Sequence, residues 1–357
     1  MRLSNLVTLS LMGVASAAPA RHHQHIEKRD AVTTTVKTQV TVTQGITGQT
    51  NALLQEDAVV GTTAAAAVAV AAAAGTTSTL EPSSAAGSSS SSGSSPSSSV
   101  TAGNAKGITY SPYASDGTCK SASDVASDLA QLTSYGIIRL YGVDCSQVEN
   151  VLKAKASSQK LFLGIYYVDQ IADGVSTIKN AVESYGSWDD ISTVSVGNEL
   201  VNGGEASTAQ VGEYISTARS ALTAAGYTGS VVSVDTFIAV INNPDLCNYS
   251  DYMAVNAHAY FDENTTAENA GPWVLEQIQR VWTACGGKKD VLITESGWPS
   301  QGQTYGLAVP SEANQKTAIS SIEDTCGSAT ILFTAFNDYW KADGAYGVEK
   351  YFGILSD

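Results

Sequence analysis

Apolar, β-branched and aromatic residues gather into eight short runs between residues 106 and 357. The runs begin at Ile108, Ile137, Leu161, Thr193, Val231, Tyr252, Val291 and Thr330. Short, almost continuously apolar runs are typical of strands buried on both faces of a parallel sheet. Successive runs start 21 to 39 residues apart, which leaves room for a helix between each pair.

The segments between the runs show helical periodicity. In residues 121–136, Val125, Leu129 and Leu132 lie at i, i+4 and i+7, with Ser123 as the expected N-cap. Residues 175–186 and 208–226 follow the same pattern. Eight strand–helix repeats in 252 residues predict an α/β fold of the (β/α)8 TIM barrel type, whose usual size is about 250 residues. A doubly wound open sheet is the alternative, but no G-x-G-x-x-G or P-loop follows any run.

The first 105 residues predict export and a stalk. Residues 1–17 carry Arg2, an apolar run over 6–14 and small residues before the expected cleavage, so we predict a signal peptide. A membrane anchor needs about 20 apolar residues, roughly twice this run. Residues 18–29 end in Lys28-Arg29, which predicts a propeptide.

Residues 30–105 are rich in Thr, Ala and Ser, with 13 serines among residues 76–100. This composition cannot bury enough apolar surface to offset chain entropy, so we predict a disordered, O-glycosylated stalk. We further expect no membrane span and no C-terminal lipid-anchor signal. The predicted location is secreted and extracellular.

The net charge and the number of histidines limit which partners and which catalytic or metal sites the chain can have. Lys plus Arg number 19 and Asp plus Glu number 34, a net charge of −15 that repels phosphate backbones and argues against nucleic acid as a partner. Three of the four histidines precede the predicted propeptide cleavage, leaving His258 for the barrel. One histidine is too few for a histidine-rich zinc site, and it leaves little basis for a histidine-based catalytic triad. We therefore predict no metal and no cofactor.

All five cysteines follow the stalk: Cys119, Cys145, Cys247, Cys285 and Cys326. In an exported protein this predicts two disulfides and one remaining thiol, with 15 arrangements open; buried reduced cysteines are the alternative. Asn248 and Asn264 lie in N-x-S/T sequons and are predicted glycosylation sites.

Two carboxylates end two of the predicted strands. Glu199 follows Asn198 in VSVGNEL, and Glu295 lies in LITESGWPS. Barrel enzymes carry their chemistry at the carboxyl ends of the strands. A pair of carboxyl groups there is the equipment of glycoside hydrolysis, where one protonates the leaving oxygen and the other attacks or activates water.

The motifs ITESGWPS and VGNE resemble glycoside hydrolase family 17, the endo-β-1,3-glucanases, across residues 106–357. The resemblance implies that Glu199 is the general acid/base and Glu295 the nucleophile of a retaining enzyme. It also implies carboxyl groups about 5 to 5.5 Å apart, a raised pKa for Glu199 and an ionised Glu295. Asn198 is then expected to hold the sugar 2-hydroxyl.

Other strand ends supply expected substrate contacts. We predict that Tyr260 orients Glu295 by a hydrogen bond, with a packed aromatic side chain as the alternative. His258, where plant relatives usually have a tyrosine, is expected to be structural or sugar-contacting. Asp338, Trp340 and Lys341 resemble the family's acidic-plus-lysine end. Aromatic residues expected to stack on glucose rings are Trp298, Trp340, Tyr110, Tyr113 and Tyr166.

Together with the predicted signal peptide, the stalk and the two glutamates, the resemblance implies a secreted, extracellular, monomeric fungal cell-wall enzyme that hydrolyses β-1,3-glucan, which is the leading prediction. Three alternatives share the same residues: a β-glucosidase of exo specificity, a β-1,3-glucanosyltransferase in which a second glucan replaces water, and a wall mannoprotein or adhesin with little turnover.

Overall fold

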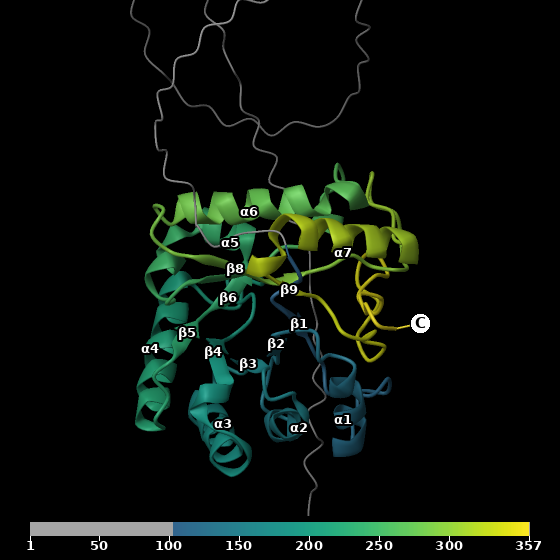
Figure 1. The fold of residues 1–357 in the computed structure, drawn as a ribbon. Helices are drawn as coiled ribbons and strands as arrows, with labels where there is room; N and C mark the ends of the chain where they lie inside the picture. The colour runs from purple at the N-terminus through teal and green to yellow at the C-terminus, as the bar shows by residue number, and fades with distance from the viewer. Residues whose placement is uncertain (1–102, 357) are drawn as a thin grey trace, which may run out of the picture. The chain divides into compact units, whose positions relative to one another are not determined.

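The computed structural model describes residues 103–356, and these form a ring of parallel strands surrounded by helices (Figure 1). The predictions for the signal peptide, the propeptide and most of the stalk lie outside the described residues. Within the described part, Ala105 is buried, and its N–H donates to the Glu323 carboxyl at 3.2 Å. The packed region therefore reaches slightly upstream of residue 106.

The strands are β1 (Gly107–Thr109), β2 (Ile137–Arg139), β3 (Lys160–Ile165), β4 (Ile191–Val196), β5 (Ser230–Val232), β6 (Val234–Thr236), β7 (Met253–Asn256), β8 (Val291–Ser296) and β9 (Thr330–Leu332). Their order is β5-β4-β3-β2-β1-β9-β8-β7-β6, with every pair parallel. Only Ser233 separates β5 from β6. The two are thus halves of one strand that closes the ring, and all eight predicted strands are confirmed.

The helices are α1 (Ala122–Ala130), α2 (Gln147–Ala154), α3 (Ile171–Tyr185), α4 (Thr208–Ala224), α5 (Phe237–Asn242), α6 (Ala270–Ala284) and α7 (Glu312–Cys326). Short 3-10 turns occupy Trp188–Asp190, Pro244–Asn248, Ala259–Phe261, Ala267–Asn269 and Gly327–Ala329. Between β9 and residue 356 the chain forms turns and loops, without an eighth helix. The TIM-barrel prediction is confirmed with this one departure.

Local sequence explains where several helices begin. The first helix is capped by Ser121 rather than by the predicted Ser123, because the Ser121 side chain and Asp124 form a capping box. Val125 and Leu129, two of the residues in the predicted helical pattern, are buried in this helix. Ser207 caps α4 in the same way.

Two buried layers hold the barrel together. Six strand residues form a cluster of their own, which we assign to the inside of the ring: Phe162, Val232, Val234, Ala254, Leu292 and Ile331. A larger cluster joins strands to helices. Helices α6 and α7 lie side by side (Figure 1), and a Cβ on Gly271 would be 1.9 Å from the Ser321 carbonyl oxygen. Only glycine permits this approach.

Two disulfides are present, Cys119–Cys145 and Cys247–Cys285, and Cys326 is a buried free thiol. The prediction of two bridges and one thiol is confirmed. Among residues 103–356, no helix has both the length and the hydropathy needed to cross a membrane.

Candidate active site

Glu295 lies near the carboxyl end of β8 and is only 3% exposed. Its Oε1 atom accepts hydrogen bonds from Arg139 Nη1 and from the Tyr141 hydroxyl, both at 2.8 Å. Its Oε2 atom lies 3.2 Å from His258 Nε2. Because a carboxylate only accepts, this contact requires that Nε2 carry the proton.

These partners set the charge of Glu295. Burial favours the protonated carboxyl, but the Arg139 charge and the hydrogen bonds from His258 and Tyr141 outweigh it and hold the pKa of Glu295 well below its ordinary value. Burial and the neighbouring Glu295 charge raise the pKa of Tyr141 well above its ordinary value. The result is an ionised carboxylate beside a protonated phenol.

Glu199 lies three residues beyond β4, in a loop that Gly197 opens with a φ of 72°. Its Oε1 accepts a hydrogen bond from Asn256 Nδ2 at 2.8 Å. Asn256 ends β7, and its Oδ1 accepts from Thr294 Oγ1 at 2.8 Å, which turns the amide nitrogen toward Glu199. Glu199, the acid/base candidate, is therefore held by a residue of β7, and β7 pairs with β8, the strand that carries Glu295.

Arg139 connects Glu295 to Asn198, the residue before Glu199. It is 1% exposed, donates from Nη1 to Glu295 and from Nη2 to Asn198 Oδ1 at 2.9 Å, and lies 4.4 Å above the Tyr141 ring. The structure thus brings together Asn198, Glu199, His258 and Glu295 from three strand ends. Sequence reasoning missed Arg139, Tyr141 and Asn256, although a charged residue inside the apolar run IIRLYG was an available signal.

Three predicted substrate contacts are wrong. The Tyr260 hydroxyl donates to the Gln303 carbonyl rather than to Glu295, and its ring packs on Trp298 at 5.8 Å. Trp298 is 0% exposed and donates to the Val309 carbonyl. Tyr110 is also 0% exposed and donates to Asp128. Fully buried rings have no face to offer a sugar, so these residues belong to the core.

Other aromatic residues lie in loops at the carboxyl ends of the strands. Half-buried Tyr113 and Trp340 contact each other with ring centroids 4.7 Å apart. Tyr166 packs on the exposed Tyr167 at 5.3 Å. Tyr113, Trp340 and Tyr166 remain candidates for stacking on sugars, and the structure adds Tyr167 beside Tyr166.

The segment after β9 holds the predicted acidic and basic residues. Asp338 is buried, forms an ion pair with Lys341 at 3.0 Å and accepts from Trp340 Nε1 at 3.0 Å. Lys341 Nζ lies 4.7 Å from the centre of the Phe333 ring. The pair thus braces the loop that carries Trp340.

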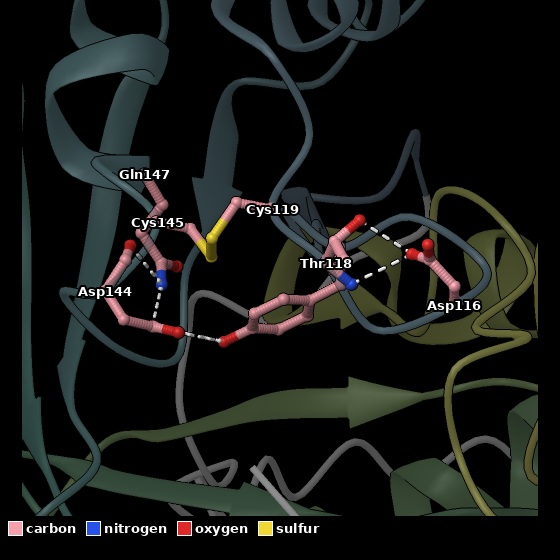
Figure 2. The surroundings of a disulfide bond; sticks show 7 residues. Asp116, Thr118, Cys119, Asp144, Cys145 and Gln147 are labelled. Carbon is pink, nitrogen blue, oxygen red and sulfur yellow. Dashed lines mark hydrogen bonds between the residues drawn. A yellow bond between two sulfur atoms is a disulfide. The ribbon is translucent and has the colours of Figure 1, made fainter. Parts of the chain in front are cut away.

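A disulfide ties two of the loops at this end of the barrel. Figure 2 shows Cys119–Cys145 beside Asp144 and Gln147. The bridge joins the loop after β1 to the loop after β2. Asp144 accepts from the Tyr113 hydroxyl at 2.9 Å and from Gln147 Nε2 at 2.7 Å. The covalent and polar contacts together fix the ring that packs on Trp340.

The two sequon asparagines, Asn248 and Asn264, are both exposed, and their glycosylation stays a prediction. Among the described residues, no three His, Cys, Asp or Glu side chains gather in a group that could hold a metal ion.

Comparisons with known proteins point to glycoside hydrolases. The family model described as the BtgE/BtgC glycoside hydrolase domain matches residues 107–353. A Saccharomyces cerevisiae protein named "Probable family 17 glucosidase SCW10" is 67% identical over the full length of both chains. The Candida albicans "Cell surface mannoprotein MP65" is 67% identical over 73% of this chain and 69% of its own.

Among solved structures, the Rhizomucor miehei family 17 β-1,3-glucanosyltransferase matches with a TM-score of 0.60 and 23% identity, covering 71% of this chain and 93% of that one. At that identity the likeness supports the barrel fold alone. The family model spans well over half of the sequence, and the chain accordingly belongs to the BtgE/BtgC glycoside hydrolase family, within glycoside hydrolase family 17.

Proposed function

We propose that this glycoside hydrolase is a secreted, retaining enzyme that cleaves β-1,3-glucan in the fungal cell wall, with Glu295 as nucleophile and Glu199 as acid/base. The observation that carries the proposal is the Arg139 contact with Glu295, which keeps a deeply buried carboxylate ionised. An ionised carboxylate attacks the anomeric carbon and forms the glycosyl-enzyme. A second carboxyl group must then protonate the leaving oxygen.

Glu199 suits the second task. It faces the same cluster through Asn256, and it is partly exposed, so a leaving group and later a water can reach it. In the first step its proton passes to the glycosidic oxygen. In the second step Glu199 takes a proton from water as the water displaces Glu295 from the sugar. The separation of 5 to 5.5 Å between the carboxyl groups remains a prediction.

Asn198 supports the same mechanism. Its Oδ1 accepts from Arg139 at 2.9 Å, which orients the side chain and leaves the Nδ2 amide to donate to a sugar hydroxyl. A hydrogen bond to the 2-hydroxyl strengthens as positive charge develops on the ring in the transition state. Arg139 would thus position both the nucleophile and a substrate contact.

The relatives support the substrate and location only by analogy. The S. cerevisiae relative is named a glucosidase, the C. albicans relative a cell surface mannoprotein and the R. miehei structure a β-1,3-glucanosyltransferase. The paired rings Tyr113–Trp340 and Tyr166–Tyr167 are suited to the apolar faces of glucose units. A neutral glucan also meets no repulsion from a chain of net charge −15.

Product analysis of the full chain with laminari-oligosaccharides tests the proposal. We expect shorter products from the wild type, and a loss of several orders of magnitude in Glu295→Gln and Glu199→Gln. Retention of the anomeric configuration in the first product checks the retaining mechanism. Products longer than the starting oligomer would show that the enzyme transfers glucan chains to a second glucan instead of hydrolysing them. Unchanged substrate with retained glucan binding in all variants would favour an adhesin.

A further inference from the structure

The loop that carries Glu199 has a backbone that costs free energy to hold. Glu199 has a φ of 56°, in the left-handed region, where a residue with a side chain loses about 1–2 kcal/mol. Its N–H donates to the Val234 carbonyl of β6 at 2.9 Å. Backbone hydrogen bonds to the carbonyl groups of Glu199, Leu200 and Val201 close the turn. The N–H groups of Val201 and Asn202 are held by a side chain instead.

Asp235, the next residue along β6, provides that fixation. It is 4% exposed. Its Oδ2 accepts from the Val201 N–H at 2.8 Å, and its Oδ1 accepts from the N–H groups of Asn202 at 3.1 Å and Thr236 at 2.9 Å. Thr236 Oγ1 also donates to Asn202 Oδ1 at 3.1 Å. One carboxylate thus joins the Glu199 turn to the strand and to the start of α5.

Only a carboxylate fits this arrangement. Three N–H donors converge on two oxygens, and an amide would direct an NH₂ group at one of them. Keeping the carboxylate here is costly: burial raises the pKa of Asp235 to about 6, although the three N–H groups act in the opposite direction. The buried Asp235 carboxylate thus costs free energy while it holds a strained turn beside Glu199. Strained backbone and groups with a shifted pKa are often found where a protein positions a functional residue.

We infer that Asp235 is a positioning residue for the acid/base step: its carboxylate fixes the 197–202 turn so that the Glu199 carboxyl meets the glycosidic oxygen. The inference rests on the proposed function. It assigns Asp235 no contact with substrate.

Substrates with different leaving groups test this role. A laminari-oligosaccharide has a poor leaving group and needs the acid, whereas 2,4-dinitrophenyl β-laminaribioside has a good one and does not. For Asp235→Asn we expect kcat on the oligosaccharide to fall about 10-fold or more with little change in KM, since general acid catalysis contributes roughly 10²–10⁴-fold. The pre-steady-state burst of dinitrophenolate should keep the wild-type rate. Azide, which needs no base to attack the glycosyl-enzyme, should restore turnover.

Two controls separate the possible failures. Glu199→Gln should also lose kcat on the oligosaccharide while keeping the dinitrophenolate burst, and its loss should be larger than that of Asp235→Asn. If it is not selective in this way, the proposed role of Glu199 fails, whatever the result for Asp235. Asp251→Asn removes a carboxylate that accepts the Val231 N–H at 2.7 Å at the start of the same strand, and should leave both substrates unchanged. If Glu199→Gln is selective but Asp235→Asn slows both substrates equally, Asp235 is merely structural and the inference is overturned. Should Asp235→Asn not fold, Asp235→Glu keeps the charge, displaces it by one methylene and carries the same test.

Discussion

Arg139 donates to Glu295 at 2.8 Å, and both side chains are almost completely buried, 2% and 5% exposed. A buried ion pair contributes little net stability, but removal of one partner leaves the other charge uncompensated. The pair therefore serves the charge state of Glu295 more than the fold. It also links β2 to β8, two strands that are not neighbours in the ring.

Replacing Arg139 with methionine tests whether the charge state of Glu295 depends on Arg139. Without the positive charge, burial would dominate and the pKa of Glu295 would rise, so the acidic limb of the kcat/KM profile should move to higher pH. We expect kcat to fall about 10²-fold or more, as for other preorganised charge contacts, and the free energy of unfolding to fall by roughly 3–5 kcal/mol. A pH–rate profile and urea unfolding measure the two effects. An unchanged acidic limb would contradict the assignment of Arg139.

The Tyr141 hydroxyl donates one of three side-chain hydrogen bonds to Glu295. Tyr141→Phe should therefore raise the pKa of Glu295 by a smaller amount than Arg139→Met, and lower kcat about 10-fold. Tyr260→Phe is the matched control, because the Tyr260 hydroxyl donates to the Gln303 carbonyl instead. That variant should leave the acidic limb in place. Equal shifts in both variants would rule out a specific role for Tyr141.

The sequence predicted the ring of strands and the strand-end location of Glu199 and Glu295 because both depend on local patterns. Continuous apolar runs report burial, and the first polar residues after them report the carboxyl ends of the strands. The partners of Glu295 were harder to find. Arg139 and Tyr141 lie 156 and 154 residues away in sequence, and only the closed ring brings them to β8.

The incorrect aromatic assignments have a related cause. Trp298 and Tyr110 follow strands just as substrate contacts do, but both rings turn into the core, where their polar atoms find the Val309 carbonyl and Asp128. A sequence pattern reports that an aromatic residue follows a strand without reporting which way its ring points. Trp340 occupies a similar position and remains half-buried in its loop.

Asp235 should give the folded protein a distinct pH dependence. Its pKa is about 6 when folded against an ordinary 3.8, so the folded state binds the proton more tightly, and this stabilisation, present below pH 4, is lost as pH rises through 6. At about 1.4 kcal/mol per pKa unit the loss is roughly 3 kcal/mol. Glu295, with a lowered pKa, acts in the opposite direction, being stabilising above its unfolded pKa. Subtracting unfolding curves of Asp235→Asn from wild type at pH 4, 5, 6 and 7 cancels the Glu295 contribution. A difference independent of pH would contradict the raised pKa.

The Cys119–Cys145 bridge should matter for substrate binding as well as stability. It fixes the loops in which the Tyr113–Asp144 hydrogen bond holds the Tyr113 ring against Trp340. Replacing both cysteines with serine should lower the free energy of unfolding by about 2–4 kcal/mol. It should also raise KM several-fold for long laminari-oligosaccharides while kcat changes little. The matched control replaces Cys247 and Cys285, whose bridge joins the segment before β7 to the end of α6, at the opposite end of the barrel. That pair should lose similar stability with KM unchanged. If both double variants raise KM alike, the effect is general loosening, and the Tyr113–Trp340 pair is not a sugar platform.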